Sequence, residues 1–125
     1  MCKVLERKGK GVQKVGRPVY RWWDYVRKIV RAYPDLSTGE LNGVDDIRDR
    51  EAVAKAVADT MQRLDGAERI ELIRYVYWNR KQHRVKDAAP RMHISEATAK
   101  RWHGDFIREV ARNRGFSIND TVKPK

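Results

Sequence analysis

Apolar residues recur every three or four positions along most of the chain, which is the spacing of one face of an α-helix. Four segments show this period, at residues 18–33, 46–64, 65–79 and 96–114, and a shorter one covers 84–92. No segment alternates as a half-buried strand does, and there is no internal repeat or long heptad series. The pattern predicts an all-α fold, a small helical domain of about five helices.

Each of the first three predicted helices has one apolar face that we expect to be buried. On the first helix this face comprises Trp22, Val26, Ile29 and Tyr33, with Val19, Trp23 and Val30 beside it. On the second it comprises Val53, Val57, Met61 and Leu64, and on the third Ile70, Ile73, Val76 and Tyr77. Aromatic residues at helical spacing usually pack in the core, so we expect Trp22 to be buried, whereas Trp23 suits either the core or the stacking of bases.

Polar and turn-forming residues predict where these helices begin and end. Pro34 should end the first helix, because proline cannot donate the helical hydrogen bond, and residues 34–44 should form a loop. Asp45 or Asp46 is expected to cap the second helix. Asp65 should cap the third, with Glu68 three residues later forming something close to a capping box.

Residues 84–103, RVKDAAPRMHISEATAKRWH, have the pattern of a helix-turn-helix. A short apolar segment ends at Met92, a break follows at residues 93–95, and a basic amphipathic helix begins at Glu96 with Ser95 as its expected cap. The buried stripe of this last helix should be Ala99, Trp102, Phe106 and Val110, which makes Trp102 a core residue. The opposite side should carry Ala97, Lys100, Arg101, Gly104 and Arg108. Small and basic residues beside a helix N-terminus suit the reading of a DNA groove, although a basic outer face is also typical of a helix that is simply solvated.

Two residues of this motif depart from the usual pattern. His93 stands where helix-turn-helix proteins often have glycine, at a position that tends to require a positive φ, and histidine is among the residues that tolerate it. Pro90 removes one backbone hydrogen bond from the first helix of the pair. We therefore expect that helix to be short, kinked or late in starting.

Positive charge is concentrated at two places. The chain of 125 residues has 28 Lys and Arg against 17 Asp and Glu, a net charge of +11. Residues 1–21 hold seven basic residues and one acidic residue, and residues 74–114 hold eleven basic and four acidic, whereas residues 22–73 hold eight basic and eleven acidic. Two basic regions that flank an acidic one favour two contact zones on a polyanion such as DNA. Positive charge that only aids solubility is the alternative explanation, and the clustering of the charge favours contact with a polyanion over it.

Residues 1–17 are basic, contain three glycines and lack apolar periodicity, which predicts a flexible arm. Basic arms can enter the DNA minor groove. Gly16-Arg17-Pro18 matches the centre of an AT-hook weakly, because Val15 replaces the preceding arginine, and Pro18 suits the first turn of a helix better. At the other end, residues 116–125 are expected to be a short tail.

No pattern of catalytic or metal-binding residues emerges from the chain. His83, His93 and His103 recur every ten residues, which is no helical repeat, and no Cys or carboxylate completes a metal-ligand spacing. Asp65, Glu68 and Glu71 could imitate a nuclease cluster, but the first two are better explained as helix caps. We therefore expect neither catalysis nor a cofactor.

The single cysteine, Cys2, allows no internal disulfide, and neither a membrane span nor a signal-peptide pattern is present. These features favour a location in the cytoplasm.

The segment from Leu64 to Arg101 resembles the domain of the main bacterial sigma factors that recognises the promoter −35 element. The matching residues are Leu64, Glu68-Arg69, the LIRYVY run at 72–77, Ala89, Ile94-Ser95, Thr98-Ala99 and Arg101. Residues 22–116, about three quarters of the chain, more closely resemble phage late transcription regulators of the RinA type. The shared features are Tyr33-Pro34, the Tyr-x-Tyr-Trp cluster of the third helix, Ser95-Glu96-Ala97-Thr98 and Lys100-Arg101-Trp102. This resemblance implies a small phage-encoded activator of late structural and packaging genes, which would act in the cytoplasm of the bacterial host cell.

We accordingly divide the chain into an arm (1–17), a helical pair (18–64), a sigma-like helix-turn-helix region (65–115) and the tail. The expected DNA-binding residues are Ser95, Glu96, Ala97, Thr98, Lys100 and Arg101, with Arg84, Lys86 and Arg108 and, in the arm, Arg17, Lys14 and Lys10. The expected partners are promoter DNA and bacterial RNA polymerase, the latter contacted by the acidic second helix or the aromatic first helix.

The alternative function is a small terminase subunit or another DNA-packaging protein. Terminase subunits form rings and generally carry a long oligomerisation segment, whereas only eleven residues follow Arg114, which favours a monomer or dimer.

Overall fold

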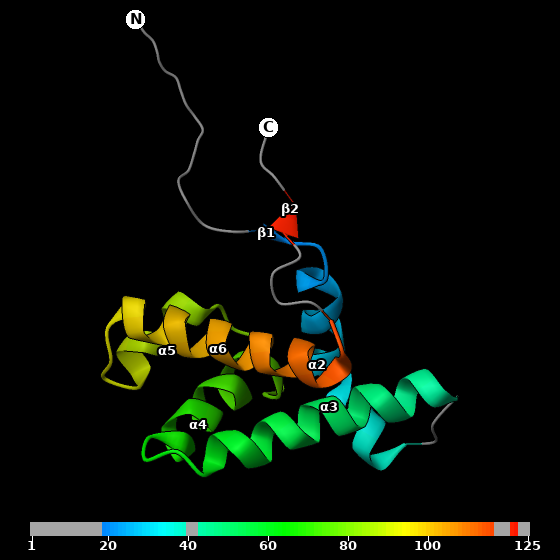
Figure 1. The fold of residues 1–125 in the computed structure, drawn as a ribbon. Coiled ribbons are helices and arrows are strands. Elements are labelled where there is room, and N and C mark those ends of the chain that lie inside the picture. The colour runs from blue at the N-terminus through cyan, green and yellow to red at the C-terminus, as the bar shows by residue number, and fades with distance from the viewer. Residues whose placement is uncertain (1–18, 40–42, 117–120, 123–125) are drawn as a thin grey trace, which may run out of the picture.

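The computed structural model describes residues 19–39, 43–116 and 121–122, which form five α-helices and one pair of very short strands (Figure 1). The helices are α2 (Trp23–Thr38), α3 (Val44–Met61), α4 (Gly66–Tyr77), α5 (Val85–Arg91) and α6 (Glu96–Arg114). β1 (Val19–Tyr20) and β2 (Thr121–Val122) pair antiparallel, so part of the predicted tail is in extended contact with the start of the described chain. The predicted small all-helical domain of five helices is confirmed.

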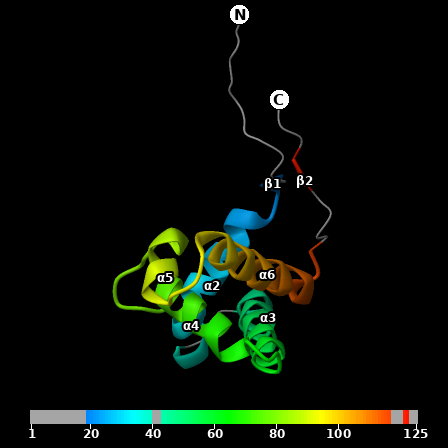
Figure 2. The same ribbon diagram turned by 90° about the vertical axis from the view of Figure 1, so that its left-hand side faces the viewer.

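Helix α6 crosses the centre of the molecule and contacts each of the other four helices (Figure 1). α3 lies beneath α6 and α5 lies beside its N-terminal half, as the turned view of Figure 2 also shows. The core between these helices is apolar, and its largest fully buried side chains are Leu72, Ile73, Ile107, Val26, Val30, Val53 and Val110. Each such side chain stabilises the fold by about 1.5–3 kcal/mol through its removal from water. α6 is thereby held in a fixed orientation by its buried face.

Helix α2 begins later and ends later than the sequence predicted. Its first residue is Trp23, after extended backbone at β1, so the predicted start at residue 18 is wrong. Pro34 lies inside the helix, which continues to Thr38, so the predicted end is wrong as well. Proline leaves the carbonyl of Val30 without its helical donor, and the indole N–H of Trp78 donates to that oxygen at 2.7 Å instead. The Trp22 side chain is buried, as predicted, and Trp23 is partly buried against the core.

Helix α3 buries only part of the predicted face. Val53 is buried and Val57 packs partly buried against the core, as predicted. Leu64 lies beyond the end of the helix and is fully exposed, and Met61 is half exposed, so both are wrongly assigned to the core. The buried residues that the prediction missed are Asp49, Ala52, Ala56 and Thr60. The Asp49 carboxylate can be buried because it accepts a hydrogen bond of 2.6 Å from Arg114 Nε at the end of α6.

Neither predicted aspartate cap forms as expected. Asp45 and Asp46 lie in the first turn of α3, and Gly43 precedes that helix without a side-chain cap. Asp65 precedes α4, but its carboxylate accepts from Arg69 Nε at 2.9 Å and caps no backbone N–H. Gly66 then allows α4 to start directly against the end of α3, because a Cβ at this residue would collide with the carbonyl oxygen of Thr60.

Candidate nucleic-acid interface

The turn between α5 and α6 is closed by two backbone hydrogen bonds. The Ile94 N–H donates to the Ala89 carbonyl at 3.0 Å, and the His93 N–H donates to the Pro90 carbonyl at 3.2 Å. This pair of bonds is a Schellman motif, in which one residue adopts the left-handed backbone conformation with positive φ. Here that residue is His93, with φ 59°. The predicted positive φ at His93 is confirmed. The turn fixes the direction in which α6 leaves α5.

Helix α5 is short, as Pro90 led us to expect. It spans Val85–Arg91 with Pro90 in its last turn, where only one interior hydrogen bond is lost. Ala88 and Ala89 are its buried residues, and small side chains at these positions let α5 pack closely on α6. α5 therefore supports α6 while its charged residues remain on the outside.

The predicted cap of α6 is confirmed. Ser95 has extended backbone angles, and its hydroxyl oxygen accepts from the Thr98 N–H at 3.0 Å. The same hydroxyl donates to the Thr98 side-chain oxygen at 2.9 Å. A serine cap typically contributes about 1 kcal/mol, and it sets the first residue of the helix. The N–H groups of Glu96 and Ala97 have no acceptor within the helix, and a helix N-terminus of this kind attracts anions.

The two faces of α6 agree with the sequence prediction except at one residue. Ala99, Trp102, Phe106 and Val110 are all buried, so Trp102 belongs to the core. Ala97, Lys100 and Arg101 are exposed on the outer side. Gly104, predicted to be exposed, is buried because the Arg108 side chain covers it, with Nη1 at 3.2 Å from the position of a Cβ.

The exposed basic residues of α6 differ in how they are paired. Lys100 forms an ion pair of 2.7 Å with Glu96, one turn earlier, and the hydrogen bond from Lys100 lowers the pKa of the Glu96 carboxyl. Arg101 is exposed and has no ion-pair partner among the described residues. An unpaired guanidinium next to the helix N-terminus has all its donors available for base edges or phosphates. Arg101 is thus the strongest candidate for a DNA contact on this helix.

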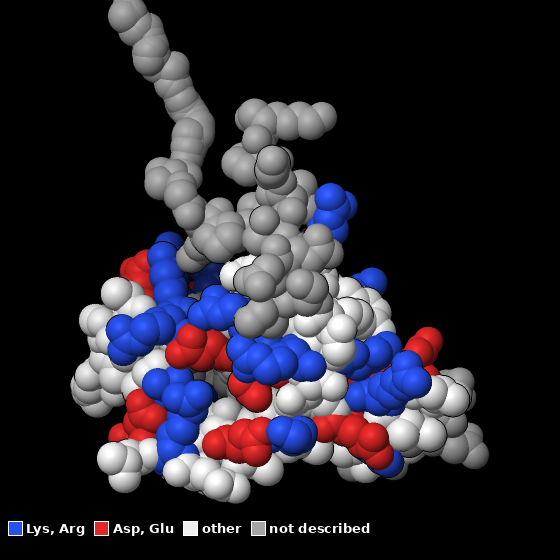
Figure 3. Space-filling view, in the orientation of Figure 1, with Lys and Arg blue, Asp and Glu red and all other residues white. Residues whose placement is uncertain are grey.

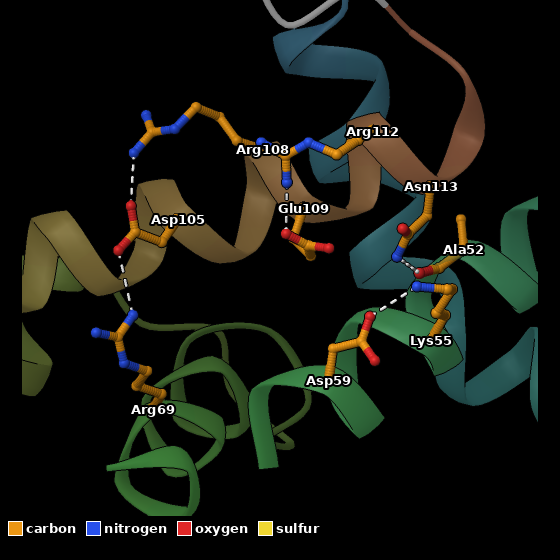
Figure 4. A network of polar contacts seen from close by, with 9 residues as sticks. All are labelled: Ala52, Lys55, Asp59, Arg69, Asp105, Arg108, Glu109, Arg112 and Asn113. Atoms are coloured by element: carbon orange, nitrogen blue, oxygen red, sulfur yellow. Dashed lines mark hydrogen bonds and ion pairs between the residues drawn. The ribbon is translucent and has the colours of Figure 1, made fainter. Parts of the chain in front are cut away.

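Arg108 and Arg112, further along α6, take part in the polar contacts of Figure 4. Arg108 Nη2 lies 2.7 Å from Asp105, whose other carboxylate oxygen accepts from Arg69 of α4 at 3.1 Å. Arg112 pairs with Glu109 at 2.6 Å. Asp105 therefore joins α6 to α4. Arg108 would have to break its ion pair with Asp105 to reach a phosphate.

The other predicted contact residues lie on α5 or in the arm. Arg84, directly before α5, pairs with Asp87 at 3.2 Å, and Lys86 is exposed. Arg17, Lys14 and Lys10 lie outside the described residues, as does Pro18. Figure 3 shows Lys and Arg side chains gathered along α6, with Asp and Glu side chains among them.

The three histidines occupy separate places. His83 stacks on Tyr75 with ring centroids 4.0 Å apart, His93 forms the turn, and His103 Nε2 lies 2.7 Å from the Tyr77 hydroxyl. Within the described residues, no group of three or more His, Cys, Asp or Glu side chains is placed to hold a metal ion. None of the described helices is long and apolar enough to cross a membrane.

The sequence prediction missed two arginines of α2 beside this region. Arg27 and Arg31 are four residues apart, and both guanidinium groups lie over the ring of Tyr77, 5.9 and 5.8 Å from its centroid. Their spacing on one helix face was visible in the sequence. Their position next to α5 was not, because it depends on how α2 packs on α4.

No family model, curated protein or solved structure matches the chain. The function is therefore inferred from the geometry and charge of the α5–α6 unit and its surroundings.

Proposed function

We propose that the protein is a sequence-specific double-stranded-DNA-binding transcription regulator in which α6 is the recognition helix. One observation carries this proposal: the turn through His93 and the Ser95 cap present an α6 N-terminus with Ala97, Lys100 and Arg101 exposed. In helix-turn-helix proteins the corresponding residues enter the major groove.

Each residue of this surface would have a distinct role. Arg101 would form a bidentate contact to guanine, and the small Ala97 would allow close approach to the bases. Ser95, Thr98 and the free N–H groups of the first turn would meet a phosphate. Lys100 would exchange its Glu96 partner for DNA, which frees the Glu96 carboxylate for the amino group of a cytosine.

The finer proposal is activation of phage late genes together with bacterial RNA polymerase. It is supported by the sequence resemblance to late regulators of the RinA type and to the sigma domain that recognises the −35 element. α3 offers a surface for the polymerase, because its outer side exposes apolar and acidic residues, namely Val44, Ile47, Asp45, Glu51 and Asp59.

The first experiment selects DNA sites from a random duplex library and measures the affinity of variants for the selected site. Arg101→Ala should weaken binding by about 1–3 kcal/mol and relax the preference at one base pair. Arg48→Ala removes the same charge from the exposed side of α3 and is the matched control. It should leave the affinity and the base-pair preference unchanged. A library with no enriched sequence, or an Arg101→Ala protein that binds as the wild type does, would refute the role of α6.

The second experiment is run-off transcription by bacterial RNA polymerase from templates that carry the selected site upstream of a promoter. The protein should increase the transcript yield, and Arg101→Ala should abolish the increase. A measurement of size in solution accompanies it, because a closed ring of many subunits would favour the packaging function over the regulator.

A further inference from the structure

Arg27 and Arg31 lack the acidic partner that five other described arginines have. Arg69, Arg84, Arg108, Arg112 and Arg114 each pair with a carboxylate. Arg27 and Arg31 form no ion pair within the described residues, although they lie over the same Tyr77 ring. Both guanidinium carbons lie within 6 Å of the same ring centroid, so the two like charges repel one another, and an anion that contacts both would reduce this repulsion.

The Arg27 side chain is held in place by a chain of hydrogen bonds. Its Nε donates to the Tyr77 hydroxyl at 2.9 Å, and the hydroxyl lies 2.7 Å from His103 Nε2 on α6. The Tyr77 hydroxyl therefore links Arg27 of α2 to His103 of α6. Tyr77 is almost fully buried, so the two remaining nitrogens of Arg27 are presented at the surface by a rigid support.

These arginines line an open surface pocket of about 360 Å³. The pocket is formed by α2, the end of α4 and the segment that leads into α5. Its potential hydrogen-bond donors are Arg27, Arg31, Gln82, His83 and Arg84, and no acidic residue lines it. Several guanidinium groups around one cavity provide the geometry that binds a phosphate group.

The pocket is connected to the recognition helix through α5. Arg84 lines the pocket and immediately precedes α5, and Lys86 lies in the first turn of that helix. Lys86 is close enough to α6 to lower the pKa of the Glu96 carboxyl, in addition to the larger effect of Lys100. Arg84 and Lys86 thus connect the pocket on α2 with the N-terminal region of α6.

We propose that the pocket of Arg27 and Arg31 binds a phosphate of the DNA backbone, beside the groove that α6 enters. This inference rests on the proposed DNA-binding function and extends it to α2. The contact would fix the orientation of the protein on the duplex without reading its sequence.

The test measures DNA affinity by fluorescence anisotropy at salt concentrations between about 50 and about 200 mM, on the selected site and on a mixed-sequence duplex. Arg31→Gln should lower the slope of log affinity against log salt by about 0.9, and the double change with Arg27→Gln by up to about 1.8. The loss should be equal on both duplexes, because a phosphate contact carries no sequence information. Arg31 is exposed, so its replacement should lower the melting temperature only slightly, through the loss of its contact with the Tyr77 ring.

Arg48→Gln on α3 is the charge-matched control and should keep the wild-type slope. An Arg31→Gln protein with the wild-type slope overturns the inference, and the proposed function survives if Arg101→Ala still weakens binding. Calorimetric titration with inorganic phosphate and pyrophosphate tests whether the pocket binds a free phosphate instead of a phosphate of the DNA backbone. Saturable binding of either one, lost in Arg31→Gln while the DNA slope stays unchanged, would make the pocket a site for a free phosphate and would also overturn the inference.

Discussion

Trp102 shows how one residue connects the core with the candidate DNA-binding surface. Its side chain is 8% exposed and packs between α4 and α6, and the Arg69 guanidinium lies over its ring at 5.4 Å. The same Arg69 holds Asp105 of α6. Trp102 therefore sets the position of α6 from the buried side, and any effect on DNA must act through the fold.

Replacement of Trp102 by alanine should cost about 3–5 kcal/mol of stability, because it leaves a large cavity beneath α6. The free energy of unfolding from urea titration checks this, and Trp102→Phe, which keeps a ring under Arg69, should cost less. At a temperature where Trp102→Ala is still folded, its DNA affinity should equal that of the wild type. A protein of unchanged stability that no longer binds DNA would identify Trp102 as a contact residue instead.

At the level of elements, α2 depends on a partner distant in sequence. The Val30 carbonyl that Pro34 leaves without a donor accepts from Trp78, 48 residues further along the chain. The indole replaces the missing backbone N–H and ties α2 to the end of α4. A proline that would otherwise interrupt the helix thereby becomes compatible with it.

A double-mutant cycle tests this compensation. Trp78→Phe should leave the Val30 carbonyl unsatisfied and destabilise the protein by about 1–3 kcal/mol beyond the loss of ring contacts. In the Pro34→Ala background the restored N–H can donate to Val30, so the same change should cost about 1 kcal/mol less. The measurement is the free energy of unfolding of all four proteins. Equal costs in the two backgrounds would show that the indole does not replace the backbone donor.

At the scale of the whole molecule, positive charge is concentrated in two regions, and each is a candidate for DNA contact. Residues 74–114 carry eleven Lys and Arg, several of them exposed around α5 and α6, and residues 1–21 carry seven more. Attraction to phosphates is additive over such groups and independent of sequence. The N-terminal charges should therefore strengthen binding to every duplex, while α6 determines the choice among them.

Deletion of residues 1–16 removes Lys3, Arg7, Lys8, Lys10 and Lys14. The slope of log affinity against log salt should decrease by roughly two to four, if only some of the five engage phosphates at once. The relative preference among DNA sites should persist. A truncated protein that keeps the full slope would place these charges elsewhere, for example on an acidic protein partner.

The sequence alone was sufficient to predict α5, most of α6, and α4 apart from its cap and its end at Tyr77. Three features made this possible, namely the apolar period, the Ser95 cap and the break at His93. All three depend on interactions between residues within about six positions along the chain, so the local sequence predicts them. For the same reason, the exposed position of Arg101 was predictable once the buried stripe of α6 was known.

Only the tertiary structure decided the features that depend on distant partners. Pro34 is tolerated because of Trp78, Asp49 is buried because of Arg114, and Leu64 is exposed because α3 ends before it. Arg27 and Arg31 form a pocket with α5 only because α2 packs on Tyr77. The physical reason is common to all these cases. The cost of burying or unpairing a polar group depends on which group faces it, and that neighbour is established only when helices far apart in sequence pack together.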